Sequence, residues 1–374
     1  MRILYVCNDL PYFNAHRQWL AAAARQAGAE VLLATGAVSA EAAAADPEVI
    51  ALDVERHRFD LRSDAALARS VRGITARLRP DVVHLITIKP VLFGALGLLG
   101  ETYPRRIVAT FPGLGRVFDP AQNSPKARLR RALVCKGLAL GLAPERVRAV
   151  FETEADRARL LSFGVLDERR ALHVPGAGVD PVLYPHTPLP PGPFRVLFAS
   201  RLLKTKGVMI VAEAAALLAA QGSNVEIVIA GAEQRIDPDA LDPLQMAALY
   251  ENPHLRFIGE VGGQSMATLI ASCHAVVLPT TYQEGVPRIL IEAAAMGRGL
   301  IVSNNPGCTA LVNTPSAGIV LEDLTAAELA SVIARLAVDG EARQVLADGA
   351  YRRFIEGGFS TDYVRGATLA LYEA

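Results

Sequence analysis

Two glutamates stand eight residues apart in the stretch TTYQEGVPRILIEAAAMGRG, residues 280–299. Glu284 lies in the loop expected after a buried strand, AVVLPT, and Glu292 lies in the helix expected after Pro287. Proline suits the first turn of a helix, where its missing N–H costs nothing. The backbone N–H groups at such a helix start form an anion site, and here they belong to Gly285, Val286 and Arg288. An acidic pair beside an anion site predicts a ligand that carries both hydroxyl groups and phosphates.

Polar residues also follow the strands predicted in the first half of the chain. Asp9, His16 and Arg17 lie in or after the loop that leaves the first strand, and Lys89 follows the third. His16 could orient a ligand or cap the following helix, and Lys89 could bind a diphosphate or be an ordinary surface lysine. Gly113 lies in FPGLG, a loop that could approach a ligand with its backbone, although glycine serves any tight turn equally.

The elements that would position these residues form two α/β domains. Short aliphatic runs such as RILYVC, DVVHLIT and RRIVATF alternate with helical segments, which is typical of parallel sheets covered on both faces. Residues 180–194 hold six prolines, so they cannot continue a helix or a central strand, and we interpret them as a linker. The alternation then restarts with RVLFAS. We expect two tandem Rossmann-like domains whose parallel sheets face a cleft, with the ligand beyond the carboxyl ends of the strands.

Composition argues against several classes of protein. The chain has 374 residues, of which 51% are hydrophobic and 20% charged, enough for two globular cores. Its four cysteines are far apart and form no CxxC pair, which favours neither a zinc site nor a disulfide framework. The N-terminus is typical of a first strand and not of a signal peptide, and the apolar run at 91–100 is too short to span a bilayer. Few aromatic residues, the lack of a recognition module and the lack of a GxGxxG after the first strand argue against nucleic acid as partner and against a dinucleotide oxidoreductase.

Residues 101–150 carry more basic than acidic residues. Within them the segment 124–148, SPKARLRRALVCKGLALGLAPERVR, is basic and partly amphipathic. Such a segment can lie on an anionic membrane surface, with lysines and arginines at the lipid headgroups and leucines inserted. The alternative is an ordinary helix that packs on the sheet and keeps a solvated basic face.

Three motifs together resemble a known enzyme family. EGVPRILIEAAAMG, 284–297, resembles the E-x7-E signature of the retaining glycosyltransferases of family 4, which have the two-domain GT-B fold. SRLLKTKG, 200–207, resembles the family's element that holds the donor diphosphate, with Arg201 and Lys206 at its cationic positions. VPGAGVD, 174–180, is similar to the family's G-S-G-V-D. TIKPVLFGALG and FPGLGRVF look like the branch that builds bacterial cell-surface polysaccharides on polyprenyl diphosphate.

The resemblance implies a role for each matching residue. Glu284 would hydrogen-bond the donor sugar, and Glu292 would hydrogen-bond the ribose of the nucleotide. Arg201 and Lys206 would neutralise the diphosphate as it leaves, because fixed cations stabilise the charge that grows in the transition state. The further residues that would bind the donor are Gly285, Val286 and Arg288. Anomeric configuration would be retained, and no metal or other cofactor would be needed.

The resemblance also implies a division of the chain. Residues 1–180 would form the acceptor-binding domain, 181–193 a proline-rich linker and 194–352 the domain that binds the nucleotide-sugar donor. A C-terminal helix within 353–374 would pack back on the first domain. The acceptor side would then hold Asp9, His16, Arg17, Lys89 and Gly113.

We therefore predict a GT-B enzyme that moves a hexose or N-acetylhexosamine from a nucleoside diphosphate, uridine being expected. The acceptor would be a saccharide linked to polyprenyl diphosphate in capsule, O-antigen or exopolysaccharide synthesis. The enzyme would be cytoplasmic and peripheral on the inner face of the cytoplasmic membrane. A nucleotide-sugar epimerase of the same architecture and a catalytically silent glycosyltransferase-like scaffold remain as alternatives. Beside Ala177, which stands where the family's G-S-G-V-D has Ser, two positions depart from the family pattern, namely Thr153 where Asn is expected and Gly299 where Pro is usual.

Overall fold

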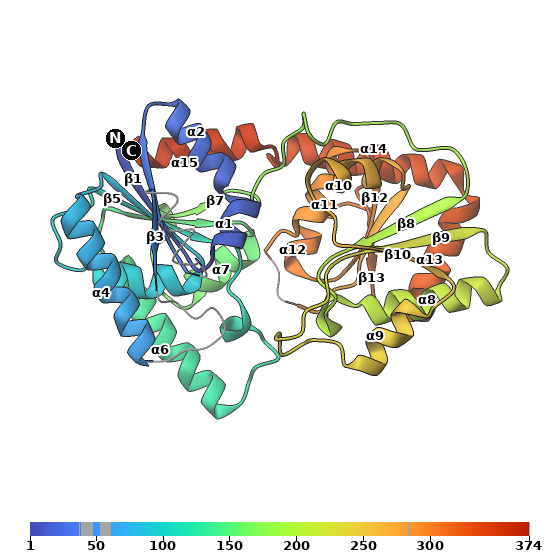
Figure 1. Cartoon of the computed structure of the whole chain (residues 1–374), viewed down its shortest axis with the longest axis horizontal. Helices are drawn as coiled ribbons and strands as arrows, with labels where there is room; N and C mark the ends of the chain where they lie inside the picture. Colours follow the sequence, from blue (N-terminus) through green and yellow to red (C-terminus); the bar gives the residue numbers. More distant parts are fainter. Residues whose placement is uncertain (37, 39–47, 53–60, 283–284, 374) are drawn as a thin grey trace. The chain divides into compact units, whose positions relative to one another are not determined.

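The computed structural model describes residues 1–36, 38, 48–52, 61–282 and 285–373. It separates into two compact units, residues 1–177 with 362–374 and residues 178–361 (Figure 1). Glu284 lies outside the described residues, so the structure says nothing of its surroundings.

The first unit is built on a parallel sheet whose described strands follow the order β3-β2-β1-β4-β5-β6-β7. The strands are β1 Arg2–Cys7, β2 Glu30–Thr35, β3 Val49–Ala51, β4 Val82–Ile86, β5 Arg106–Phe111, β6 Val147–Phe151 and β7 Ala171–His173. Its helices include α1 Leu10–His16, α2 Gln18–Gln26, α4 Leu61–Leu78, α5 Ala95–Gly97, α6 Pro125–Leu142, α7 Glu154–Ser162 and α15 Thr361–Glu373. A π-helical turn covers Pro90–Gly94. The order reverses between β1 and β4, so the loops after these strands adjoin a topological switch point.

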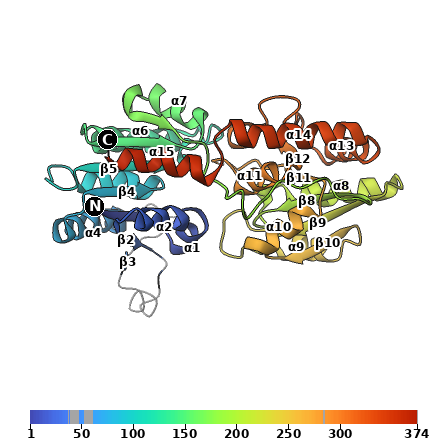
Figure 2. The same cartoon turned by 90° about the horizontal axis from the view of Figure 1, so that it is seen from above.

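Both faces of this sheet are covered, as the near-continuous apolar strands predict. Along β1, Leu4 and Val6 belong to the apolar cluster beneath α4 and α6, while Ile3 and Tyr5 belong to the cluster beneath α2 and α15. Figures 1 and 2 show these two pairs of helices on opposite faces of the strands. The last helix, α15, therefore completes the first unit although it ends the chain.

A buried polar network fastens α15 to the sheet. The hydroxyl of Tyr372 lies 2.7 Å from His84 Nδ1 and 3.0 Å from the hydroxyl of Tyr5. His84 Nε2 lies 2.7 Å from Thr110 Oγ1. Burial, with Arg17 acting in the same direction, lowers the pKa of His84 to about 3, so the imidazole is neutral at physiological pH.

The second unit has its own parallel sheet, with described strands in the order β10-β9-β8-β11-β12-β13. They are β8 Phe194–Ala199, β9 Val225–Ala230, β10 Leu255–Gly259, β11 Ala275–Leu278, β12 Gly299–Ser303 and β13 Ile319–Leu321. The helices are α8 Val208–Ala220, α9 Pro243–Tyr250, α10 Gly263–Ala271, α11 Arg288–Ala295, α12 Pro306–Thr309, α13 Ala326–Val338 and α14 Gly340–Glu356. Here the order reverses between β8 and β11. Both units are thus parallel-sheet, Rossmann-like domains of the expected α/β class.

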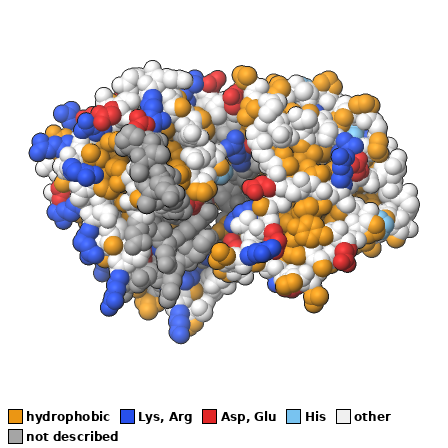
Figure 3. Space-filling model, in the orientation of Figure 1, with side chains coloured by type: hydrophobic (Ala, Val, Ile, Leu, Met, Phe, Trp, Pro, Cys, Tyr) orange, Lys and Arg blue, Asp and Glu red, His pale blue; other side chains and the backbone are white. Residues whose placement is uncertain are grey.

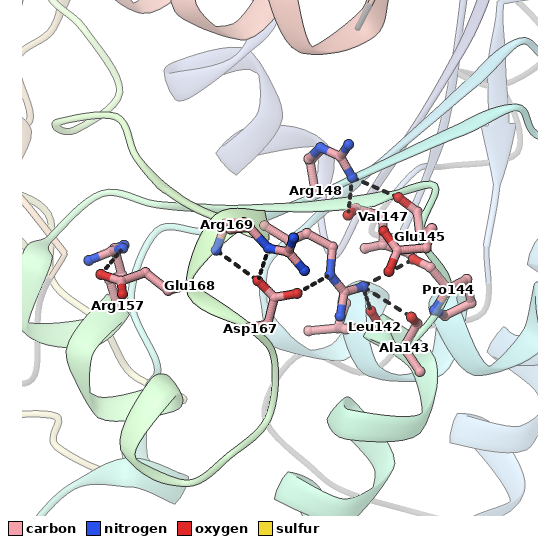
Figure 4. A network of polar contacts seen from close by, with 11 residues as sticks. Leu142, Ala143, Pro144, Glu145, Val147, Arg148, Arg157, Asp167, Glu168 and Arg169 are labelled. Carbon is pink, nitrogen blue, oxygen red and sulfur yellow. Dashed lines mark hydrogen bonds and ion pairs between the residues drawn. The ribbon is translucent and has the colours of Figure 1, made fainter.

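Many arginines in the first unit bind backbone carbonyl groups. Arg170 donates to the carbonyl oxygens of Leu142, Ala143 and Pro144 at 2.7–3.2 Å and thereby closes the carboxyl end of α6. Figure 4 labels these three residues, together with Asp167, which accepts from Arg169 N at 2.8 Å. Arg146 donates in the same way to three carbonyls between α5 and β5, at 2.8–2.9 Å. Carbonyls at the end of a helix lack partners within the helix, and a guanidinium can satisfy several at once. Part of the basic character of residues 101–150 is therefore structural.

Two positions that depart from the family pattern have plain local roles. Thr153 precedes α7, and its hydroxyl accepts a hydrogen bond from Asp156 N at 3.1 Å, the usual work of a helix cap. Gly299 opens β12, and its N–H donates to His274 O at 3.2 Å, a bond that proline could not make.

None of the helices in the described ranges combines the length and the apolar character needed to cross a bilayer.

Candidate functional site

The loop that leaves β8 carries the two predicted cations. Arg201 Nη1 lies 3.2 Å from Asp237 Oδ2, in the loop after β9, and the Arg201 side chain is 37% exposed. Lys206 ends a short 3-10 turn, Lys204–Lys206, and is only 6% exposed. The chain therefore brings both cations to the carboxyl end of β8, beside the switch point of the second sheet.

This loop is held rigidly against the loop after β11. The carbonyl of Thr205 accepts hydrogen bonds from Thr281 N at 2.8 Å and Thr280 Oγ1 at 3.0 Å. Gly207 has φ +78°, and a Cβ there would meet Pro279 O at 2.2 Å, so only glycine allows this approach. The cationic loop and the segment that leads to the E-x7-E motif thus form one structure.

The opposite side of the cationic loop is fixed by the loop after β9. Thr205 Oγ1 donates to Asp239 Oδ2 at 3.2 Å, and Lys204 N donates to Asp239 O at 2.9 Å. A Cβ on Gly231 would lie 1.9 Å from Ser200 O, so these two loops also depend on a glycine to meet.

Lys206 lies in an unusual electrostatic setting. Burial lowers the pKa of its ammonium to about 7, and the positive charge of Arg201 lowers it further, while Cys308 and Asp237 act in the opposite direction. The ammonium lies 5.2 Å from the centre of the Tyr282 ring, a distance at which the ring face attracts a cation. Lys206 is therefore poised between its neutral and charged forms near pH 7, and a bound anion would favour the charged form.

Glu292 projects from α11 and is 6% exposed. Its Oε1 accepts a hydrogen bond from Arg288 Nε at 2.8 Å. Burial raises the pKa of the Glu292 carboxyl, and the charge of Arg288 and a hydrogen bond from the Tyr184 side chain oppose that rise. The predicted pair Arg288 and Glu292 is thus in direct contact, and Tyr184 is a partner that the sequence did not indicate.

The predicted anion site lies where α11 begins. Pro287 occupies the cap position, with φ −64° and ψ 125°, one residue earlier than the first-turn position expected for it. Pro287 itself makes no side-chain capping hydrogen bond to this helix start. Gly285 and Val286 immediately precede it, and Val286 is 7% exposed.

Two further residues of the second unit were missed. Asn305 Nδ2 donates to Tyr282 O at 2.6 Å, and Ser303 Oγ donates to Thr280 O at 2.6 Å. Ser303 ends β12 and Asn305 follows it, and both hold the loop after β11. The only sequence signal was their place at the end of a predicted strand.

In the first unit, Asp9 and His16 lie at the two ends of α1. Asp9 is the N-cap, and its Oδ1 accepts from Tyr12 N at 2.8 Å. His16 ends the helix, with its ring stacked on that of Tyr12 at 4.5 Å. The residue at the cap of α2 is Arg17, so the capping alternative for His16 is wrong.

The other predicted first-unit residues are two buried cations in ion pairs and a half-buried loop glycine. Arg17 is 3% exposed and pairs with Glu152, which follows β6. Lys89 is 2% exposed, with Nζ 3.1 Å from Asp64 Oδ1, so the surface-lysine alternative is wrong. Gly113 is half-buried in the loop after β5.

The described geometry brings Arg201 and Lys206 together, and Arg288 together with Glu292, within the second unit. Two cations near one another at a strand end can bind a diphosphate, and a buried carboxylate can accept hydrogen bonds from a diol. Within the described ranges, no three His, Cys, Asp or Glu side chains gather as a metal site would require.

Comparison with protein families gives two matches. Residues 185–353 match the family described as "Glycosyl transferases group 1", and residues 2–140 match "Glycosyl transferase 4-like". Each match falls within one of the two units.

Curated relatives match over part of their length. An "Alpha-D-kanosaminyltransferase" from Streptomyces kanamyceticus is 30% identical over 156 residues, 41% of this chain and 39% of the relative. An "N,N'-diacetylbacillosaminyl-diphospho-undecaprenol alpha-1,3-N-acetylgalactosaminyltransferase" from Campylobacter jejuni is 26% identical over 178 residues, 48% of this chain and 44% of the relative. The matched segments thus span less than half of these two relatives.

Solved structures match over the whole chain. A sucrose-phosphate synthase from Thermosynechococcus elongatus superposes with a TM-score of 0.78 at 17% identity, covering 100% of this chain and 98% of the other. Anabaena Alr3699/HepE in complex with UDP superposes with a TM-score of 0.74 at 18% identity, covering 100% of both chains. These similarities show the fold. Taken with the two family matches, they show that the chain belongs to the glycosyltransferases of GT-B type.

Proposed function

We propose that the protein transfers a hexosyl or N-acetylhexosaminyl group from a nucleoside diphosphate sugar, with retention of configuration, to a saccharide linked to polyprenyl diphosphate. The observation that carries this proposal is the arrangement of Arg201 and Lys206 at the carboxyl end of β8, tied by backbone hydrogen bonds to the loop after β11. Glu292, on the following helix α11, supplies a buried carboxylate.

The chemistry follows from where charge develops. When the bond from the anomeric carbon to the diphosphate breaks, negative charge grows on the leaving group. Arg201, Lys206 and the N-terminus of α11 stabilise that charge, and because they are fixed in advance they need little reorganisation. Glu284 holds the hydroxyls of the sugar, and the departing phosphate takes the proton of the acceptor hydroxyl. No step requires a metal ion or another cofactor.

The donor and acceptor are proposed with support from the compared proteins. A neighbouring structure is described in complex with UDP-glucose, which supports uridine in the donor. One relative is named for an acceptor on diphospho-undecaprenol, and another, 23% identical, is named "Capsular polysaccharide biosynthesis glycosyltransferase CapM". In the first unit the acceptor would be bound by Asp9, His16, Arg17, Lys89 and Gly113. Because Arg17 and Lys89 are already paired, they act by shaping these loops as well as through their charge.

Thermal denaturation with a nucleotide panel tests the proposal. Native-state binding raises the apparent stability of a protein, so UDP and UDP-sugars are expected to raise the melting temperature of the wild type more than GDP or ADP. Arg201→Ala and Glu292→Ala should blunt that rise. The matched control is Arg235→Ala, an arginine in the loop after β9 that is 82% exposed and pairs with Glu233.

The outcomes separate the candidate functions. A folded wild type that no nucleotide stabilises would refute the proposal and favour a silent scaffold. Binding followed by epimerisation of the free nucleotide-sugar, seen by NMR without an acceptor, would favour the epimerase. Release of nucleoside diphosphate only when a saccharide acceptor on polyprenyl diphosphate is added would support the transferase.

We also propose that α6 docks the protein on the inner face of the cytoplasmic membrane, so that the protein is cytoplasmic and peripheral. Three leucines of this helix are strongly exposed, Leu129 at 64%, Leu133 at 63% and Leu140 at 54%. Exposed cations accompany them at Lys126, Arg128, Arg130 and Lys136. Figure 3 shows lysine and arginine side chains over the region of α4 and α6. This combination suits an anionic lipid surface.

Liposome flotation tests the docking proposal. Vesicles with phosphatidylglycerol should carry the wild type, and vesicles of phosphatidylcholine alone should not. Replacing both Leu129 and Leu133 by Ser should weaken flotation, while Leu244→Ser, an 83% exposed leucine of α9, should leave it unchanged. Arg131 is left in place because it donates to three backbone carbonyls at 2.8–3.0 Å. Equal flotation of all variants would remove α6 from the proposal.

A further inference from the structure

Tyr184 comes from the proline-rich segment that precedes β8, the segment interpreted from sequence as a linker. The side chain is 1% exposed and belongs to the apolar core of the second unit. Its hydroxyl forms hydrogen bonds with the side chains of Glu292 and Arg288. A residue about a hundred positions earlier in the chain thus reaches the buried carboxylate of α11.

The backbone of this segment is fixed to the end of α11, so the tyrosine cannot readily turn away. Arg298 Nη1 donates to Thr187 O at 2.8 Å, and Nη2 donates to Pro188 O at 3.2 Å. His186 lies over Gly297, where a Cβ would come within 2.8 Å of the imidazole. Gly297 also has φ +69°, a conformation that favours glycine. These contacts hold the residues that directly follow Tyr184 against the end of α11.

The carboxylate of Glu292 has room for a ligand beside these two donors. An ionised carboxylate offers about four acceptor positions. Arg288 Nε uses one at 2.8 Å, and the Tyr184 hydroxyl uses another. The remaining capacity matches the two hydroxyls of a ribose diol.

We propose that Tyr184 is a positioning residue, which holds the Glu292 carboxylate oriented for the ribose hydroxyls of the donor. The inference rests on the proposed function, because it takes Glu292 as the ribose ligand. Tyr184 itself acts only through Glu292. It thereby makes the segment ahead of β8 part of the donor site.

Removal of the hydroxyl alone, in Tyr184→Phe, keeps the buried ring and deletes one donor to the carboxylate. The groups that face Glu292 and shift its pKa are Arg288 and Tyr184, both of which favour the ionised form against burial. Without the hydroxyl the pKa of Glu292 rises further. As the pH is lowered, the variant should therefore lose ribose binding at a higher pH than the wild type does.

Calorimetric titration with UDP and 2′-deoxy-UDP tests this, with GDP and 2′-deoxy-GDP run in parallel. The wild type should prefer the ribonucleotide, and Glu292→Gln should abolish the preference. Tyr184→Phe should reduce it about fivefold, on the scale of one typical intramolecular hydrogen bond, and should move the acidic limb of the affinity profile to higher pH. The matched control is Tyr351→Phe, whose ring packs against His186 at 4.2 Å and which should behave as the wild type.

The failures are distinguishable. If Glu292→Gln abolishes the ribose preference while Tyr184→Phe keeps the wild-type preference and pH profile, the positioning role is refuted and the proposed function stands. If Glu292→Gln also keeps the preference, the ribose assignment of Glu292 fails, and the role of Tyr184 fails with it.

Discussion

Replacing Lys206 by Met should remove a pH dependence from both folding and donor binding. Lys206 is buried, and its pKa falls from the usual 10.5 of a lysine to about 7. Between these values the unfolded chain carries a proton on Lys206 that the folded protein does not. The stability of the ligand-free wild type should therefore rise with pH from about 7 to about 10.5, because the unfolded state binds more protons there.

The expected sizes follow from the same two values. Each pKa unit corresponds to about 1.4 kcal/mol, so the free energy of unfolding should increase by about 2 kcal/mol between about pH 7 and about pH 9. If the donor diphosphate needs the charged ammonium, its Kd should rise about fiftyfold over that range, since the folded protein must then take up a proton to bind.

Chemical denaturation and calorimetric titration with UDP-glucose at several pH values measure both effects. A nucleotide-sugar is preferred to UDP because its diphosphate diester stays fully ionised over this range. Lys206→Met should show neither dependence. Lys204→Met, whose side chain is 49% exposed in the same loop, should behave as the wild type. A Kd that is flat from about pH 7 to about pH 9 in the wild type would refute the reasoning about Lys206.

Three further substitutions test contacts that lie inside one unit or the other. Gly231→Ala places a Cβ 1.9 Å from Ser200 O, so the loops after β8 and β9 must separate; UDP binding by calorimetry should weaken about tenfold or more, and an unchanged Kd would contradict this. Tyr372→Phe deletes the hydroxyl 2.7 Å from His84 Nδ1, and the free energy of unfolding should fall by about 1–3 kcal/mol; denaturation curves that coincide with the wild type would argue against the network. Arg298→Leu leaves several buried carbonyls without a donor and should cost about 3 kcal/mol or more in the same assay, whereas a change below about 0.5 kcal/mol would show that water replaces the guanidinium.

The sequence was informative wherever a signal was local. The aliphatic runs predicted two parallel sheets, and their order along the chain placed Arg201 and Lys206 after one strand and the E-x7-E motif after another. That these strands are neighbours, β8 beside β11, follows from the topology of doubly wound sheets. The structure adds that Thr205 is the backbone contact that joins the two loops.

What the sequence did not indicate depends on pairing across long separations. Glu152 and Arg17 are 135 positions apart, and neither periodicity nor a motif marks them as partners. Tyr184 lies among prolines, which predict an irregular segment but not the direction of a side chain. The sequence could not decide whether Lys89 is an ordinary surface lysine or whether His16 caps a helix, because burial in a loop is set by tertiary packing and not by local pattern.

Arg298 ties residues that precede β8 to the second unit, so this unit begins earlier in the chain than its sheet does. The guanidinium is fully buried and donates to backbone carbonyls of Ile270, Met296 and Gly297, and to Thr187 and Pro188 ahead of β8. A fragment that began at Phe194 would leave part of this charge without acceptors in the interior. The smallest piece able to fold by itself should therefore start before Tyr184. Any exchange of this unit between related proteins should transfer the proline-rich segment together with Arg298, which donates hydrogen bonds to it.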